Sequence, residues 1–208
     1  MSNSPIPIRL RDLHKVETVD ALLHNGLTEE QIRTTQSEWE PIRKQSIEAL
    51  LQQGYPIEEL PKHWGWNWTR KISQLGTPLL GFYGIECEGQ MQGLLEVAKE
   101  GHLAKLPSQK GKPLIYVKYV ETAPWNIKLL DPKPRYGGVG SRLIRIAVDL
   151  SIEEGCKGRV GLHSLPGEKK GEPEWFYQHV CLMEPMEAER DGEGLLYLDS
   201  PRKRQTNS

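Results

Sequence analysis

The sequence predicts an α/β fold built on a mixed sheet with helices on its faces. The first observation is that several β-rich segments precede residue 123 and read as antiparallel strands. The second is a Gly-rich loop over residues 131–141 that runs straight into an amphipathic helical pattern. Strand, helix and strand patterns then follow to residue 198. This order of elements is typical of a sheet covered by helices.

The bulk composition is that of an ordinary globular protein. The chain has 208 residues, of which 37% are hydrophobic and 26% are charged, which suits one domain with an elaboration or two small domains. The net charge of −1 excludes a polycation built to hold nucleic acid. No apolar run approaches the ~20 residues that a membrane span needs, and the first 15 residues lack the apolar centre of a secretion signal. We therefore expect a cytoplasmic protein without a membrane partner.

The cysteines and histidines predict no metal site. The 3 cysteines form no Cys-x-x-Cys pair and are odd in number, so neither a zinc site nor a disulfide framework is indicated. The 6 histidines show no ligand spacing. We expect reduced and mostly buried thiols.

The N-terminal third is expected to contain one strand and two helices. Residues 6–10 alternate in polarity and allow a short strand, and residues 18–24 suggest a helix. Thr28 with Gln31 three positions later forms a capping-box pattern. This pattern predicts a long helix over residues 28–53.

The packing of this region is expected to involve one apolar helix side and a tryptophan-rich segment. Pro41 predicts a kink or break in the long helix. Three tryptophans at alternate positions would lie on one side of an extended segment, with at least two of them in the core; the alternative is a lining for an apolar or cationic substrate. The apolar helix positions are Ile42, Ile47, Leu50 and Leu51, and the tryptophans are Trp64, Trp66 and Trp68.

Residues 79–198 carry the strongest strand and helix patterns. Glu88-Gly89 marks a tight turn between two strands. Residues 114–122 are nearly continuous in apolar character, as expected of a strand covered on both faces. The expected elements are strands over 79–87, 90–98 and 114–122, a helix over 139–154, a strand over 159–163, a helix over 172–180 and a strand over 194–198.

The loop from Arg135 to Ser141 is the most informative segment. Its glycines let successive backbone N–H groups converge on an anion, because no Cβ blocks the approach. The helix that follows adds unpaired N–H groups and a positive dipole end. Lys133, Arg135 and Arg142 add positive charge. The loop therefore predicts a pyrophosphate site, although a plain Gly-rich connection is the alternative.

Two common nucleotide-binding motifs do not fit this loop. A P-loop requires a lysine directly after its last glycine, and none follows here. A dinucleotide-binding fingerprint requires a third glycine where this sequence has Leu143. The antiparallel-looking strands before the loop also fit neither class.

The loop and its flanks resemble the GNAT acetyltransferases. Arg135-x-x-Gly138-x-Gly140 is similar to the [Q/R]-x-x-G-x-[G/A] motif with which that family binds the pyrophosphate of coenzyme A. Residues 114–126 (LIYVKYVETAPWN) resemble the family's long fourth strand, which splays from its neighbour and admits the pantetheine arm. Residues 163–182 resemble its later strand and helix.

The resemblance implies a fold and a division of the chain. The fold is a central mixed, mostly antiparallel sheet with helices on both faces and a helical N-terminal elaboration. Residues 79–198 would form the acyl-CoA-binding core, residues 1–78 a substrate-side elaboration of the same domain, and residues 199–208 a disordered tail. It also implies acetyl-CoA as cosubstrate and an amine acceptor, on a small molecule or a protein. A homodimer is left open.

The resemblance also implies site residues. Backbone N–H groups of Val120 and Thr122 would face the pantetheine and the thioester carbonyl. Glu121 is either a base, acting directly or through water, or a solvated or salt-bridged strand end. Tyr177 is either the acid that protonates the coenzyme A thiolate or a packed aromatic. The expected cofactor loop is Arg135, Tyr136, Gly137, Gly138, Val139, Gly140 and Ser141.

Two other functions stay open. Cys181-Leu182 replaces the closing Gly-Phe of the family pattern, and the alanine before Phe-Tyr is absent. These departures allow a catalytically inactive GNAT-like domain that binds acyl-CoA as a sensor or interaction module. A nucleic-acid-binding role for the helix over residues 28–53 is disfavoured, because acidic and basic residues mix along it and leave no basic face.

Overall fold

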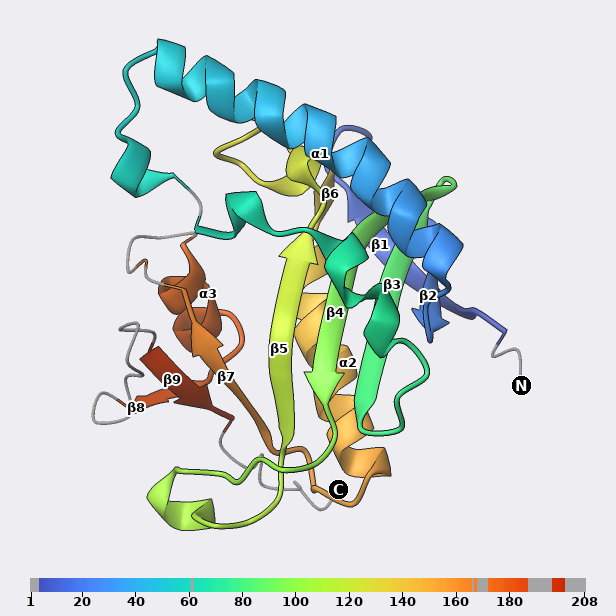
Figure 1. The fold of residues 1–208 in the computed structure, drawn as a ribbon, viewed down its shortest axis with the longest axis vertical. Coiled ribbons are helices and arrows are strands. Elements are labelled where there is room, and N and C mark those ends of the chain that lie inside the picture. The colour runs from blue at the N-terminus through green and yellow to red at the C-terminus, as the bar shows by residue number, and fades with distance from the viewer. Residues whose placement is uncertain (1–3, 61, 166, 168–171, 187–195, 201–208) are drawn as a thin grey trace. The chain divides into compact units, whose positions relative to one another are not determined.

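The computed structural model describes residues 4–60, 62–165, 167, 172–186 and 196–200 (Figure 1). The chain divides into two compact units. Unit 1 comprises residues 1–95 and 120–143, and unit 2 comprises residues 96–119 and 144–208. Each unit is built on strands. The elements that contribute residues to both units are β4 (Gln90–Ala98), β5 (Ile115–Thr122) and α2 (Val139–Glu153).

The strands of unit 1 follow the order β6-β1-β2-β3-β4. β1 pairs antiparallel with both β2 and β6, and β2 pairs antiparallel with β3. The turn between β3 and β4 is confirmed at Glu88 and Gly89, where φ is 52° and 78°, the positive values that a tight hairpin needs. The bounds are β1 (Ile6–Asp12), β2 (Glu17–Asn25), β3 (Leu80–Cys87) and β6 (Tyr136–Gly137).

The helix predicted over residues 18–24 is wrong, because these residues lie in β2. Leu22 and Leu23 are good helix formers, yet their backbone pairs with β1 on one side and β3 on the other. Tertiary strand pairing therefore overrides the local preference here. The tip of the β1–β2 hairpin is closed by Asp12, whose Oδ1 accepts hydrogen bonds from the N–H groups of His14 (2.9 Å) and Lys15 (3.0 Å).

The capping box of the long helix α1 (Glu29–Gln52) is confirmed. Thr28 Oγ1 accepts from the Gln31 N–H (3.1 Å), and the Gln31 side chain accepts from the Thr28 N–H (2.9 Å). Helix α1 continues through Pro41 without a break. Trp39 and Arg43, on either side of Pro41, are both buried and hold the helix in place.

The buried side of α1 differs from the predicted apolar side. Ile42 and Leu51 are about two-fifths exposed, so Ile47 is the predicted position that is truly buried. Trp39 determines which side of α1 faces the core, because its Nε1 donates a hydrogen bond to the carbonyl oxygen of Met91 on β4 (3.2 Å). The buried residues are Ile32, Thr35, Gln36, Trp39, Arg43 and Ile47. Figure 1 shows α1 as the long blue helix that passes over β1 and β3.

The tryptophan-rich segment is not extended. It forms 3₁₀ turns, in which the Trp66 N–H donates to the His63 carbonyl and Asn67 caps the next turn through the Thr69 N–H. Trp68 is 1% exposed, but Trp64 is 49% exposed and Trp66 is half-buried. The expectation of at least two core tryptophans here is therefore wrong, because Trp68 is the one buried member of the three. The 3₁₀ segments of unit 1 are Ile57–Glu59, Lys62–Gly65, Trp68–Gln74 and Pro124–Asn126.

Unit 2 contains the mixed part of the sheet. Its strand order is β5-β7-β9-β8, with β5 and β7 parallel and the other two pairs antiparallel. The strand and helix patterns expected after residue 155 are present, whereas β8 and the short β6 were not expected. The bounds are β7 (Val160–Ser164), β8 (Glu184–Met186), β9 (Leu196–Asp199), α3 (Pro173–His179) and the 3₁₀ turn Pro107–Gln109.

Two details of unit 2 differ from expectation. β5 buries Ile115, Val117 and Glu121 and leaves its other positions partly exposed, so it is not fully covered on both faces. Asp199, placed by the sequence in the tail, ends β9 and is completely buried. Its carboxylate accepts from the N–H groups of Lys105 and Leu106 and from Gln109 Nε2. Residues 201–208 of the predicted tail lie outside the described residues.

Candidate active site

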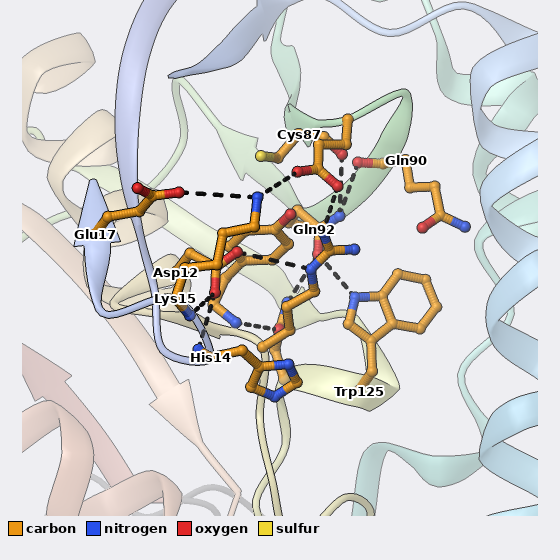
Figure 2. Close-up of polar contacts among 12 residues, drawn as sticks. Asp12, His14, Lys15, Glu17, Cys87, Gln90, Gln92 and Trp125 are labelled. Atoms are coloured by element: carbon orange, nitrogen blue, oxygen red, sulfur yellow. Dashed lines mark hydrogen bonds and ion pairs between the residues drawn. The ribbon is translucent and has the colours of Figure 1, made fainter. Parts of the chain in front are cut away.

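The first part of the glycine loop, residues 135–137, is held in place by hydrogen bonds that involve the side chains of Gln92, Trp125 and Asn126. The Tyr136 N–H donates to Asn126 Oδ1 (2.9 Å). Asn126 Nδ2 and Trp125 Nε1 both donate to Gln92 Oε1, at 3.0 and 2.8 Å. Gln92 in turn donates to the carbonyl oxygen of Gln90 (3.0 Å) (Figure 2). The Tyr136 N–H is therefore already bonded within the protein, and the role of Tyr136 in the cofactor loop stays a prediction.

The tip of the β1–β2 hairpin holds the same part of the loop from the other side. Asp12 pairs with Tyr136 and Arg11 with Gly137 in the β1–β6 ladder, and the Leu13 N–H donates to the Arg135 carbonyl (2.7 Å). A Cβ on Gly137 would lie 3.1 Å from Leu13 Cδ2, so glycine permits this close approach.

The second part of the loop presents backbone N–H groups that have no acceptor among the described residues. Gly138 has φ of 79°, a left-handed conformation that favours glycine. The Arg142 N–H donates to the Gly138 carbonyl (3.0 Å), which closes the first turn of α2. The N–H groups of Val139, Gly140 and Ser141 precede that bond and have no acceptor within the helix. Within the predicted seven-residue site, the N–H groups that the helix leaves unpaired thus belong to Val139, Gly140 and Ser141, and the cofactor-binding role of all seven residues stays a prediction.

The start of α2 is seated tightly on β4. A Cβ on Gly93 would lie 2.7 Å from Val139 Cγ1 and 2.8 Å from Leu143 Cδ1. Any larger residue would push the helix start away from the strand. Gly93 therefore helps to position the free N–H groups, a role that the sequence motif did not reveal.

Glu121 is enclosed by two donors from unit 1. Its Oε1 accepts a hydrogen bond from Arg43 Nη1, and its Oε2 accepts from Trp68 Nε1 (2.6 Å). The side chains of Arg43 and Glu121 are only 3% and 1% exposed. The sequence analysis offered two roles for Glu121, a base or a solvated or salt-bridged strand end. The structure shows a salt bridge with Arg43, and this salt bridge is buried.

The pKa of Glu121 reflects competing effects. Burial raises it to about 7, against the smaller lowering effects of the Arg43 charge and the Trp68 hydrogen bond. Nearby, burial and the Arg43 charge lower the pKa of His63 to about 4, so this imidazole is neutral at physiological pH. Glu121 is therefore the group in this cluster that changes charge near neutrality.

Arg43 and Trp68 were missed by the sequence analysis. The available signal was the spacing of Arg43, which lies four residues after Trp39 and four before Ile47, on the buried stripe of α1. An arginine on such a stripe needs a buried anionic partner. The sequence analysis offered a salt bridge as one role for Glu121, but it did not identify Arg43 as the partner.

The remaining predicted site residues lie as follows. Val120 and Thr122 flank Glu121 on β5 and are half-buried. Tyr177 lies on α3 in unit 2, where it is 9% exposed, and burial raises the pKa of its phenol. The structure places these residues without testing their roles, which stay predictions.

Comparison with solved structures identifies the fold. No protein-family model and no curated protein sequence matches the chain. The GNAT domain of S. lividans PAT is similar in structure, with a TM-score of 0.56 and 14% identity over 94% of this chain and 95% of that chain. The chain has the GNAT fold. The PaiA N-acetyltransferase from Thermoplasma acidophilum, solved with coenzyme A, has a TM-score of 0.49 and 12% identity over 88% and 99% of the two chains.

The GNAT fold confirms the α/β class predicted from the sequence. Among the described residues, no group of three or more His, Cys, Asp or Glu side chains is arranged to hold a metal ion. In that same part of the chain, no helix is long and apolar enough to cross a membrane. The three cysteines are free thiols, and Cys87 and Cys156 are buried.

Proposed function

We propose that this protein is an N-acetyltransferase that moves an acetyl group from acetyl-CoA to an amine of a small molecule or a protein. The observation that carries the proposal is the set of free N–H groups at Val139, Gly140 and Ser141, directly after the left-handed Gly138. These donors and the positive end of α2 suit a pyrophosphate. The GNAT fold supports the same assignment, although a fold alone does not define an activity.

The residues present fit the cosubstrate. Residues 138–141 would hold its pyrophosphate, while Arg135, Tyr136 and Gly137 fix the course of the loop. The backbone of Val120 and Thr122 would face the pantetheine arm and the thioester carbonyl, as the family resemblance implies. Bound acetyl-CoA supplies the electrophilic thioester.

Glu121 is proposed to accept the proton that the acceptor amine must lose, directly or through a water. A free alkylamine has a pKa of about 10.4, so a base is required at neutral pH. The Glu121 pKa of about 7 is suited to that task. Arg43 and Trp68 occupy one site on each carboxylate oxygen. A carboxylate offers about four acceptor sites, so others remain for the amine or the water.

Tyr177 is proposed to supply the proton that the departing thiolate takes up. Its buried phenol has a raised pKa and therefore stays protonated at neutral pH. Replacement by phenylalanine would lower turnover more than binding if Tyr177 has this role. An unchanged turnover would make it a packing residue.

A charge substitution at Ser141 tests the cofactor assignment. Ser141→Glu places a carboxylate in the first turn of α2, where it favours the helix but repels a pyrophosphate. Isothermal titration of the full chain with acetyl-CoA and with coenzyme A should show binding in the wild type and in Ser141→Gln, and none in Ser141→Glu. Equal binding by all three proteins would refute the assignment.

The complete enclosure of Glu121 favours one alternative, a GNAT-like domain that binds acyl-CoA without catalysis. Both carboxylate oxygens already have partners, as expected of a purely structural ion pair. A screen of amine acceptors with detection of released thiol separates the two functions. Binding of acetyl-CoA without thiol release from any amine would favour the binding module.

A further inference from the structure

The side chain of Arg135 is held by carboxylates of the protein itself. Its Nη2 donates to Glu88 Oε2 in the β3–β4 turn, and its Nε lies 4.0 Å from Asp12 Oδ2 at the end of β1. The guanidinium also lies over the Tyr136 ring, 4.9 Å from its centre. These contacts come from three separate points in unit 1. The positive charge of Arg135, which the sequence analysis counted toward a phosphate site, is thus already paired with Glu88 and Asp12.

Asp12 divides its two oxygens between two tasks. Oδ1 caps the hairpin tip through the His14 and Lys15 N–H groups. Oδ2 is buried, has no hydrogen-bond partner among the described residues and forms an ion pair with Arg135. The Lys15 backbone hydrogen bond is the main cause that lowers the pKa of Asp12, so the carboxylate stays ionised.

The hairpin tip, the β3–β4 turn and the glycine loop therefore meet at the guanidinium of Arg135. Lys15 adds a second link, because its Nζ lies 3.6 Å from Glu88 Oε1. The Arg135 carbonyl is bound by the Leu13 N–H, so both the backbone and the side chain of Arg135 are attached to the hairpin. A loop fixed in this way needs little further ordering when it binds an anion.

We propose that Asp12 and Glu88 are positioning residues for the coenzyme A loop. Together they hold the Arg135 side chain, and we call this set of ion pairs, Asp12–Arg135 and Glu88–Arg135, the strap. The pyrophosphate is contacted by the N–H groups of residues 139–141 and not by the Arg135 side chain. This inference rests on the proposed function. It assigns the β1–β2 hairpin to the cofactor side of the molecule, although residues 1–78 as a whole were expected to serve the substrate side.

The direction in which the Kd for coenzyme A changes when Asp12 or Glu88 is neutralised tests the strap. Asp12→Asn and Glu88→Gln each remove a negative charge close to the loop and release Arg135. If Arg135 were a phosphate ligand, or if the carboxylates were mere neighbours, coenzyme A would bind these variants as tightly as the wild type or more tightly. The strap predicts the opposite, a rise in Kd of about tenfold in each, because binding then includes the ordering of the loop.

The experiment is isothermal titration of the full-length variants with coenzyme A. Asn at position 12 retains the oxygen that caps the hairpin tip, and Glu88 is half-exposed, so both proteins should fold; circular dichroism and the melting temperature check this. Asp20→Asn is the matched control, since it removes one charge from the same hairpin at an exposed pair with Arg9 and should leave Kd unchanged.

A double-mutant cycle completes the test. Asp12→Asn and Arg135→Met should not be additive in their effects on Kd, because they break the same contact. Additive effects, or tighter binding by either carboxylate variant, would overturn the strap. Failure of the wild type to bind coenzyme A would instead refute the proposed function, so the two outcomes are distinct.

Discussion

Arg43 and Arg135 each engage carboxylates in unit 1, but in opposite environments. The Arg43–Glu121 pair is almost fully buried, whereas the Arg135 and Glu88 side chains are 34% and 46% exposed. Water solvates and screens the second pair, so its worth to stability is small. The first pair has lost its water, and each charge depends on the other. An arginine–carboxylate ion pair thus contributes to stability at Arg43, whereas at Arg135 it is proposed to position the backbone of the glycine loop.

The largest expected effect is that of Arg43→Met. It removes one partner of a buried ion pair, which typically costs about 3–5 kcal/mol in the free energy of unfolding. Urea denaturation at neutral pH measures the loss. A change below about 1 kcal/mol would mean that water reaches Glu121 and that the two arginine sites are less different than their exposures indicate.

The second prediction concerns the pH dependence of stability. Because the folded pKa of Glu121, about 7, exceeds the ordinary value of 4.5, the folded chain binds this proton more tightly than the unfolded chain does. The contribution of this group is therefore greatest below pH 4.5 and falls as the pH rises to about 7.

Urea denaturation of the wild type and Glu121→Gln isolates this contribution, because other groups titrate in both proteins. The wild type should lose on the order of 3 kcal/mol relative to the variant between pH 4.5 and pH 7.5. The opposite slope would show that the charge of Arg43 outweighs burial.

A smaller effect is expected at the exposed site. Glu88→Gln should lower the free energy of unfolding by less than about 1 kcal/mol, even though its proposed effect on coenzyme A binding is about tenfold. Thermal denaturation beside the titration gives both quantities. A large loss of stability would make Glu88 a folding residue and would remove the contrast with Arg43.

The smallest effect is expected at the surface of α1. Arg33 pairs with Glu29 one helical turn away, at 2.7 Å, with both side chains more than half exposed. Arg33→Met should cost about 0.3–0.5 kcal/mol, and added salt should reduce the difference from the wild type. A salt-independent loss would point to packing of the arginine stem instead.

The parts of the fold that depend on local chemistry could be predicted from the sequence. The Thr28–Gln31 box and the Glu88–Gly89 turn involve only neighbours in the chain. Residues 18–24 could not be assigned correctly, because two partner strands distant in sequence decide their conformation. The tryptophan-rich segment failed for a related reason: alternate spacing describes a strand only where a neighbouring strand is present.

The candidate site shows the same division. The glycines and the helix start at residues 138–141 are adjacent in sequence and were recognised together. Arg43, Trp68 and Glu121 come from three distant segments, and only their burial in one place shows that they belong together. Arg135 was recognised as part of the motif, but the sequence could not show that its charge is paired with Asp12 and Glu88.

The carboxylate of Asp199 has a consequence for the timing of folding. It binds backbone groups of a loop more than 90 residues earlier in the chain. During synthesis, the N–H groups of Lys105 and Leu106 therefore acquire this partner only after Asp199 has been made. Contacts with such long separations slow folding, so unit 2 is expected to complete this part of its structure late, after β9 has left the ribosome.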